Sequence, residues 1–151
     1  MDAVLMDFVR RKALLEASLE RAAADVGDIT PHVLRRLHER HPDARPRFVA
    51  LGADKADRLE HDMVEQALFC LMDWFDNRSS IEIVLAHSAP HHIETLGVSE
   101  AMFAGLITAV CETISATIPA YAPDEAAVWR DLEADMLATI AACARDARPV
   151  A

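Results

Sequence analysis

The amino-acid sequence predicts an all-α protein of about six or seven helices that form one domain over residues 1–151. Apolar residues recur at helical spacing along nearly the whole chain. The chain is 52% hydrophobic but has only 4 glycines, which argues against disorder and against an all-β sandwich with its many turns. Its length is sufficient to bury one hydrophobic core. Residues 1–6 and 147–151 are expected to be flexible ends.

The first two helices are predicted from apolar stripes and from the residues that should begin or end them. Residues 4–25 form the first helix, whose stripe consists of Leu5, Phe8, Leu15, Leu19 and Ala22. Gly27 should end this helix. Thr30 followed by Pro31 predicts an N-cap and a first-turn proline for a second helix, whose inward residues are Val33, Leu34 and Leu37.

The middle of the chain is predicted to contain a break and then a long helix. Two prolines within residues 41–48 predict a short turn or a broken helix. A long helix over residues 54–77 follows, with one apolar face made by Leu59, Met63, Ala67, Cys70, Leu71 and Trp74. A further helix begins after residue 80, and Pro90 is expected to interrupt or restart it.

The last two helices are predicted from the residues at their starts. Ser99 should cap a helix whose inward residues are Met102, Phe103, Leu106, Ile107, Val110 and Ile114. Pro123, Asp124 and Glu125 mark the start of the final helix, because acidic side chains in a first turn interact favourably with the helix dipole. The stripe of this helix consists of Trp129, Leu132, Met136, Ile140 and Cys143.

The charge balance excludes several classes of partner. With 15 basic and 25 acidic residues, the formal net charge is −10, which disfavours binding to nucleic acids and to anionic membrane surfaces. No apolar stretch reaches the ~20 residues that a bilayer requires, and the amphipathic, acid-containing N-terminus is unlike a signal or transit peptide. The 3 cysteines are far apart in apolar runs, which indicates reduced thiols and predicts a cytoplasmic protein.

Three histidines, His87, His91 and His92, are crowded into one short segment. A neutral imidazole is the commonest metal ligand in proteins. In one interpretation His87 and His91, four residues apart on a helix, bind a metal ion together with a third ligand. In another, a single histidine is the axial ligand of a porphyrin iron. The alternative to both is that all three are solvated histidines near a loop.

Six landmark residues follow one another at characteristic separations along the chain: Pro42, Phe48, Met63, His92, Val98 and Phe103. In the last helix, Trp129 follows Pro123 at a further characteristic separation. These separations resemble those of the globin family, in particular short single-domain bacterial globins, and the resemblance covers essentially the whole chain.

The resemblance implies a globin fold, a three-over-three helical sandwich, with one haem b (iron protoporphyrin IX). It implies that His92 is the proximal iron ligand, and that its other ring nitrogen bonds a backbone carbonyl one turn earlier, near Ser88. Because Pro90 restricts the backbone here, His91 and His87 remain alternatives for this role. The residues implied to contact the haem are Leu34, Phe48, Met63, Ala67, Leu96, Val98, Phe103 and Leu106, and Leu68 and Ile140 are further candidates for the walls of its slot.

The chain departs from the family pattern at Met63, since most oxygen-binding globins place His or Gln at this distal position. Met63 cannot donate a hydrogen bond. It could be an apolar plug, or a thioether that acts as the sixth iron ligand. In a third alternative, a small rotation of the helix brings His61 or Gln66 inward. Cations for the haem propionates are available nearby in the sequence from Arg45, Arg47 and Arg58.

The expected function is therefore reversible binding of a diatomic gas (O2, CO or NO) or redox sensing, and the sequence leaves open whether the protein is also an enzyme. Nitric-oxide dioxygenation would need a separate reductase, because this sequence contains no flavin or nicotinamide domain. Two alternatives stay open. One is a haem-less sensory or interaction module with the globin fold, and the other is a helical bundle with a non-haem histidine metal site. The sequence leaves the oligomeric state open.

Overall fold

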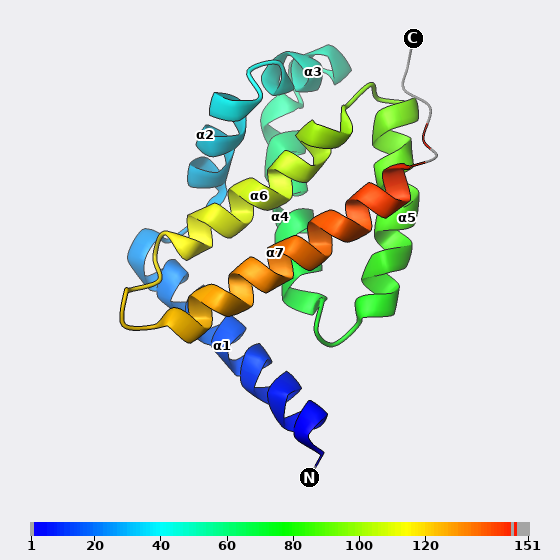
Figure 1. Cartoon of the computed structure of the whole chain (residues 1–151). Helices are drawn as coiled ribbons and strands as arrows, with labels where there is room; N and C mark the ends of the chain where they lie inside the picture. Colours follow the sequence, from blue (N-terminus) through cyan, green and yellow to red (C-terminus); the bar gives the residue numbers. More distant parts are fainter. Residues whose placement is uncertain (1, 146, 148–151) are drawn as a thin grey trace.

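The computed structural model describes residues 2–145 and 147, and within them the chain forms seven α-helices and no strand, which confirms the all-α prediction. The helices are α1 (Ala3–Val26), α2 (Thr30–Arg40), α3 (Ala44–Leu51), α4 (Ala56–Asp73), α5 (Arg78–Glu94), α6 (Glu100–Ser115) and α7 (Pro123–Ala144). In Figure 1, α6 and α7 lie side by side, with α4 and α1 behind them and α5 at one side. None of the described helices is long and apolar enough to cross a lipid bilayer.

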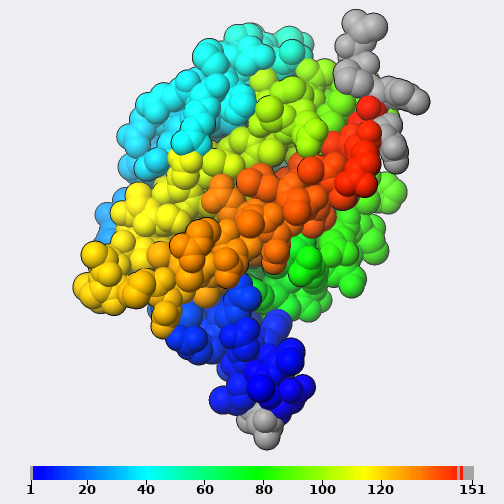
Figure 2. All heavy atoms as spheres, viewed as in Figure 1, coloured from blue at the N-terminus to red at the C-terminus, as the bar shows by residue number. Residues whose placement is uncertain are grey.

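The core is aliphatic and is centred on α6 and α7, which pack against each other and against α1, α2, α4 and α5. Its largest fully buried side chain is Trp129 of α7, which is 0% exposed. Around it lie buried aliphatic residues that the helical periodicity had placed inward, including Leu15, Leu71, Val110, Ile114, Leu132, Met136 and Ile140. Periodicity therefore predicted most of the inward faces correctly. The prediction is wrong for Leu5, which was placed on the stripe of the first helix but is 49% exposed, because the start of α1 extends beyond the rest of the molecule (Figure 2).

Two of the predicted helix ends are confirmed. Gly27 is the C-cap of α1, with a φ of +67°, a backbone conformation that glycine adopts without a side-chain clash. Ser99 is the N-cap of α6, and its Oγ accepts a hydrogen bond from the backbone N–H of Met102 at 3.1 Å.

The prediction that Thr30 caps α2 is wrong. Thr30 is itself the first residue of α2, and Ile29 holds the N-cap position without a side-chain hydrogen bond. The backbone N–H of Thr30 instead donates to Oδ1 of Asp28 at 3.0 Å. Asp28 thereby satisfies one of the unpaired N–H groups at this helix start, so the capping function lies two residues earlier than predicted.

The expected interruption at Pro90 is also wrong, because α5 is continuous from Arg78 to Glu94. A proline inside a helix removes one backbone hydrogen bond and costs about 3 kcal/mol. The buried residues Ile81, Leu85, Ala89 and Ile93 hold both halves of α5 against the core and offset this cost. Residues 41–48, predicted as a short turn or a broken helix, contain a break at residues 41–43 between α2 and α3, as predicted, followed by the first part of α3. The predicted helix over 54–77 is shorter and ends at Asp73.

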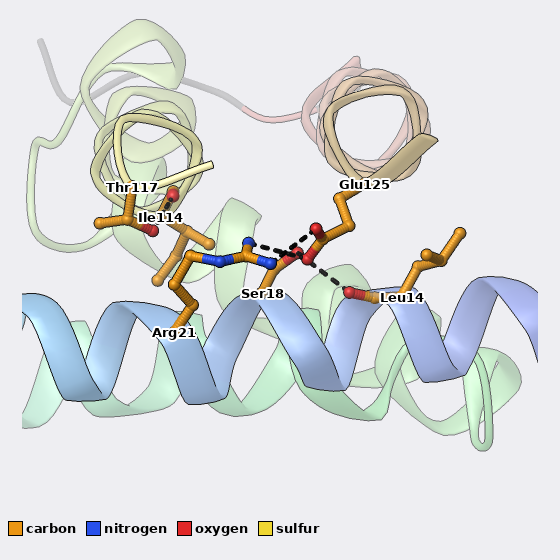
Figure 3. Close-up of polar contacts among 6 residues, drawn as sticks. All are labelled: Leu14, Ser18, Arg21, Ile114, Thr117 and Glu125. Atoms are coloured by element: carbon orange, nitrogen blue, oxygen red, sulfur yellow. Dashed lines mark hydrogen bonds and ion pairs between the residues drawn. The ribbon is translucent and has the colours of Figure 1, made fainter. Parts of the chain in front are cut away.

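The N-terminal helix is attached to α7 by a polar contact (Figure 3). The guanidinium of Arg21 donates to both carboxylate oxygens of Glu125, at 2.9 and 2.8 Å. The hydroxyl of Ser18, which is 0% exposed, lies 2.8 Å from the same carboxylate and 2.9 Å from the carbonyl oxygen of Leu14. Glu125 therefore does more than favour the dipole of α7, because it also binds α1.

The start of α1 extends beyond the rest of the molecule, as the dark blue spheres in Figure 2 show. Residues 3–6, predicted to belong to a flexible end, are part of α1. Of the other predicted ends, residues 1 and 148–151 lie outside the described residues.

Candidate ligand-binding cavity around His92

His92 lies in the last turn of α5, where its ring is held by the backbone of the preceding turn. Its Nδ1 lies 2.7 Å from the carbonyl oxygen of Ser88, and therefore carries a hydrogen that it donates to this oxygen. This is the acceptor that the resemblance implied. In a neutral imidazole with a protonated Nδ1, Nε2 is unprotonated and able to bind a metal ion. Nε2 has no hydrogen-bond partner within the described residues.

Burial lowers the pKa of His92 from its ordinary value, and the neighbouring His91 lowers it further. The hydrogen bond to Ser88 opposes these two effects without cancelling them. The lowered pKa favours the neutral ring at neutral pH, and neutrality is what metal ligation by histidine requires.

Two adjoining cavities meet at His92. The larger has a volume of about 170 Å³ and lies between α4 and α5, against α6. The smaller has a volume of about 50 Å³ and extends from His92 toward α3 and the turn between α5 and α6. Four side chains line both cavities: Met63, His92, Phe103 and Leu106. Since these four are shared, the two cavities are parts of one largely apolar space.

Most of the residues predicted to contact a haem lie around this space, although they come from four different helices and one turn. Ala67 lines the larger cavity, whereas Phe48, Leu96 and Val98 line the smaller one. The ring of Phe103 packs on the ring of His92, with 4.9 Å between their centroids. Leu34, Leu68 and Ile140 are the exceptions, because none of them lines either cavity. Leu34 and Leu68 are half-buried against the core, and Ile140 lies within it.

Helix α4 forms the side of the cavities that faces α5. Of the three candidates on α4 for the distal position, Met63, Gln66 and His61, two line a cavity and one does not. Met63 lines both cavities, and Gln66, one turn further along, lines the larger one. His61 is exposed, and its Nδ1 lies 3.8 Å from a carboxylate oxygen of Glu65 on the surface of α4. Met63 and Gln66 are therefore the side chains available to a ligand from this helix, and His61 is not.

Several lining residues were not predicted from the sequence. In the larger cavity they are Cys70, Val84, Leu85, Ser88 and Ile107, and in the smaller one they are Leu37, Ala44, Leu51 and Met102. Arg47, predicted as a candidate cation for the haem propionates, also lines the smaller cavity. Helical spacing could have identified three of the residues that were not predicted. Cys70 lies two turns after Met63 on the same face of its helix, and Ser88 and Leu85 lie one and two turns before His92. For Ala44 and Leu51 of α3 the sequence offered no such indication, whereas Phe48 and Arg47 of the same helix had been named.

Among the described residues, the alternative histidine pair belongs to no group of potential metal-ligating side chains. His87 and His91 are both exposed on α5. Among the described residues, one group of three potential metal-ligating side chains occurs, namely His61, Asp62 and Glu65, and all three are exposed. Exposed carboxylates are well hydrated, so this group by itself does not indicate a metal site.

Comparison of the chain with protein-family models, with curated proteins and with solved structures found no match.

Proposed function

We propose that this chain is a globin-type haem protein, in which His92 is the axial ligand and which binds a diatomic gas reversibly. The observation that carries the proposal is the state of His92. A neutral imidazole whose tautomer is held by Ser88 leaves Nε2 free, and the same ring lines both parts of an apolar space. The order of the helices, with α6 and α7 packed across α4 and α5, is consistent with a three-over-three sandwich.

The residues present fit a haem chemically. The walls are mostly aliphatic, and the rings of Phe48 and Phe103 offer flat surfaces on which a porphyrin can stack. His92 supplies one nitrogen donor, and the carbonyl of Ser88 is the outer hydrogen-bond partner that fixes its orientation and basicity. When bound, the haem supplies the iron at which a diatomic ligand is held.

The residues from α4 determine the polarity and the hydrogen-bond donors that the diatomic ligand would meet. Met63 contributes a thioether, which excludes water and donates no hydrogen bond. Gln66 contributes the one side-chain amide in the larger cavity, so it is the available hydrogen-bond donor from α4. Because the apolar Met63 lines both cavities together with His92, we expect a pocket that favours CO over O2. Coordination of the iron by the Met63 thioether is the alternative, which would make the protein a redox sensor.

The proposal is tested by the absorption spectrum after reconstitution with haemin. We expect stoichiometric uptake with a Soret band, and loss of uptake or of the axial-histidine spectrum in His92→Ala. His91→Ala is the matched control, because His91 is the adjacent histidine and is exposed. Absence of a Soret band in the reconstituted wild type would contradict the proposal and favour the haem-less module. Unchanged haem binding in His92→Ala would show that the ligand assignment is wrong.

The ferrous spectrum without added gas resolves the alternatives at Met63. An apolar plug predicts a high-spin, five-coordinate spectrum in both the wild type and Met63→Leu. A low-spin spectrum in the wild type that becomes high-spin in Met63→Leu would show that the thioether is the sixth ligand. A low-spin spectrum that persists in Met63→Leu would exclude both alternatives.

A further inference from the structure

The first turns of α1 carry the densest group of exposed large apolar side chains in the described part of the chain. Val4 is 75% exposed, Leu5 49%, Met6 52% and Val9 52%, and no other described helix presents more than two such side chains. Residues 2–9 form the overhang of α1, in which every residue except the half-buried Phe8 is exposed (Figure 2). Neighbouring exposed apolar side chains are typical of a surface that binds a partner.

The order of side chains along the start of α1 matches one kind of partner. Asp2, Leu5, Val9 and Lys12 are spaced by three, four and three residues, which is the spacing of the contact face between two paired helices. Residues at this spacing lie on one face of an α-helix. This face, the pairing face of α1, begins with an acid, continues with two apolar side chains and ends with a base.

The pairing face is complementary to a second copy of itself. Two such helices can run antiparallel about a twofold axis near Asp7, the midpoint of the face. Leu5 of one copy then lies opposite Val9 of the other, so the apolar side chains meet in the middle. Asp2 lies opposite Lys12 at each end, where opposite charges attract. A parallel pair would instead place like charges opposite each other, so the face favours an antiparallel second copy.

The charge of the chain also favours this end of the molecule for self-association. With a net charge of −10, two copies of the chain repel each other over most of their surfaces. Residues 2–12 differ, because they contain two acids, Asp2 and Asp7, and three bases, Arg10, Arg11 and Lys12. Two copies can therefore approach each other through this segment without the general repulsion.

The contacts that α1 makes within its own chain leave the pairing face available. Lys12 lies 2.7 Å from a carboxylate oxygen of Asp76, and its side chain remains 35% exposed. An ammonium has three N–H groups, so it can also donate to Asp2 of a second copy. Val4 and Phe8, which belong to a neighbouring face, line a hollow of their own chain together with Trp74. Because the overhang extends beyond the body, the two bodies of an antiparallel pair lie at opposite ends.

From this arrangement we propose that the overhang of α1 forms a homodimer interface, in which two copies of α1 pair antiparallel through Asp2, Leu5, Val9 and Lys12. The interface is isologous, since each copy contributes the same face. None of these residues lines a cavity around His92, so the inference goes beyond the proposed function and does not depend on it. A contact of about three helical turns is small, and we expect a reversible dimer with a dissociation constant of about 10 μM.

Sedimentation equilibrium of the full chain tests the proposal, at concentrations from about tenfold below to about tenfold above the expected dissociation constant. The wild type should pass from monomer to dimer over this range. Leu5→Glu and Val9→Lys should each weaken the dimer at least about tenfold, because a charge then lies opposite an apolar side chain. Val49→Glu, at a 40% exposed position of α3, is the matched control and should leave the dimer unchanged. Circular dichroism should show unchanged helix content, since all three positions are exposed.

Mixtures of variants test the antiparallel order. In an equimolar mixture of Leu5→Glu and Val9→Lys, the new carboxylate lies opposite the new ammonium, so a heterodimer should form with about the wild-type affinity. A mixture of Leu5→Glu and Leu5→Lys should stay monomeric, because the two positions are not opposite each other. Its dimerisation would indicate parallel helices and overturn the proposal.

Three results with the single chains would also overturn it. The first is a wild type that stays monomeric over the whole range. The second is a dimer that Leu5→Glu and Val9→Lys leave intact, which would place the interface elsewhere. The third is an equal loss of the dimer in Val49→Glu, which would show that added negative charge, and not the pairing face, controls association.

Discussion

Replacement of Glu125 by glutamine should weaken the attachment of α1 to α7. Glutamine keeps the shape of the side chain but removes the negative charge that receives two hydrogen bonds from Arg21, at 2.9 and 2.8 Å. The pair is sheltered, with 6% exposure at Glu125 and 26% at Arg21. A hydrogen bond to a charged group contributes about 1.5–3 kcal/mol, so we expect Glu125→Gln to lower the free energy of unfolding by about 2 kcal/mol at pH 7. For a chain of this size the melting temperature should fall by about 4–8 °C.

The effect should depend on pH, and its sign follows from the pKa of Glu125. The hydrogen bond from Arg21 is the main cause that lowers this pKa, the contact with Ser18 lowers it further, and burial opposes both. A lowered pKa in the folded state stabilises the fold above the ordinary value of 4.5. This contribution is lost as the pH falls through the folded-state pKa. The difference between wild type and Glu125→Gln should therefore be largest near pH 7 and shrink below about pH 4.5.

Urea unfolding, followed by circular dichroism at several pH values, measures both the loss in the free energy of unfolding and its dependence on pH. The matched control is Asp124→Asn, because Asp124 is the adjacent acid of α7 and pairs with Arg10 at an exposed site, where both side chains are more than half exposed. We expect this control to change the free energy of unfolding by less than about 1 kcal/mol. Equal losses in the two variants, or a loss in Glu125→Gln that does not change with pH, would show that the charge of Glu125 does not hold α1 in place.

Two further predictions concern the backbone and the thiols. Gly27→Ala should lower the free energy of unfolding by about 1–3 kcal/mol through backbone strain alone, because φ is +67° and a Cβ there meets no atom within 4 Å; an unchanged urea midpoint would contradict this. In the folded protein a thiol reagent should modify the half-buried Cys143 first, and Cys70 and Cys111 mainly after unfolding, because both are buried and burial raises the pKa of each. Mass spectrometry of the labelled peptides checks the order, and early labelling of Cys111 would contradict it.

The helices were largely predictable, because most of them depend on local information. Helical spacing identified the inward faces of α4, α6 and α7. Gly27 was correctly predicted to end α1, and Ser99 was correctly predicted to cap the start of α6. The errors occurred where tertiary contacts compete with local preference. Pro90 disfavours a helix locally, but the buried residues on both sides of it keep α5 continuous. At Thr30, the choice between a cap and a first helical residue was decided by Asp28.

Part of the candidate site was predictable from the order of residues. Phe48, Met63, His92 and Phe103 were named from their separations, and the structure brings them around one apolar space. Leu34 was named on the same basis and lies outside it. Sequence separation fixes the turn of the helix on which a residue lies, but the helix packing decides whether that turn reaches the cavity.

By itself, the sequence determined the helical class, the aliphatic core and the residues that could ligate a metal, because composition and spacing are local properties. Only the tertiary structure decided which histidine has a fixed tautomer and a free nitrogen beside a cavity, since that depends on the carbonyl of Ser88 and on burial. It also distinguished three arginines that composition and spacing leave equivalent. Arg47 lines the smaller cavity, Arg45 is bound to Glu60, and Arg58 is exposed. The physical reason is that Arg45 is bound by Glu60 of α4, and that the guanidinium of Arg47 lies beside Gly97 in the turn before α6. These partners come from other segments of the chain and meet the two arginines only when the helices pack.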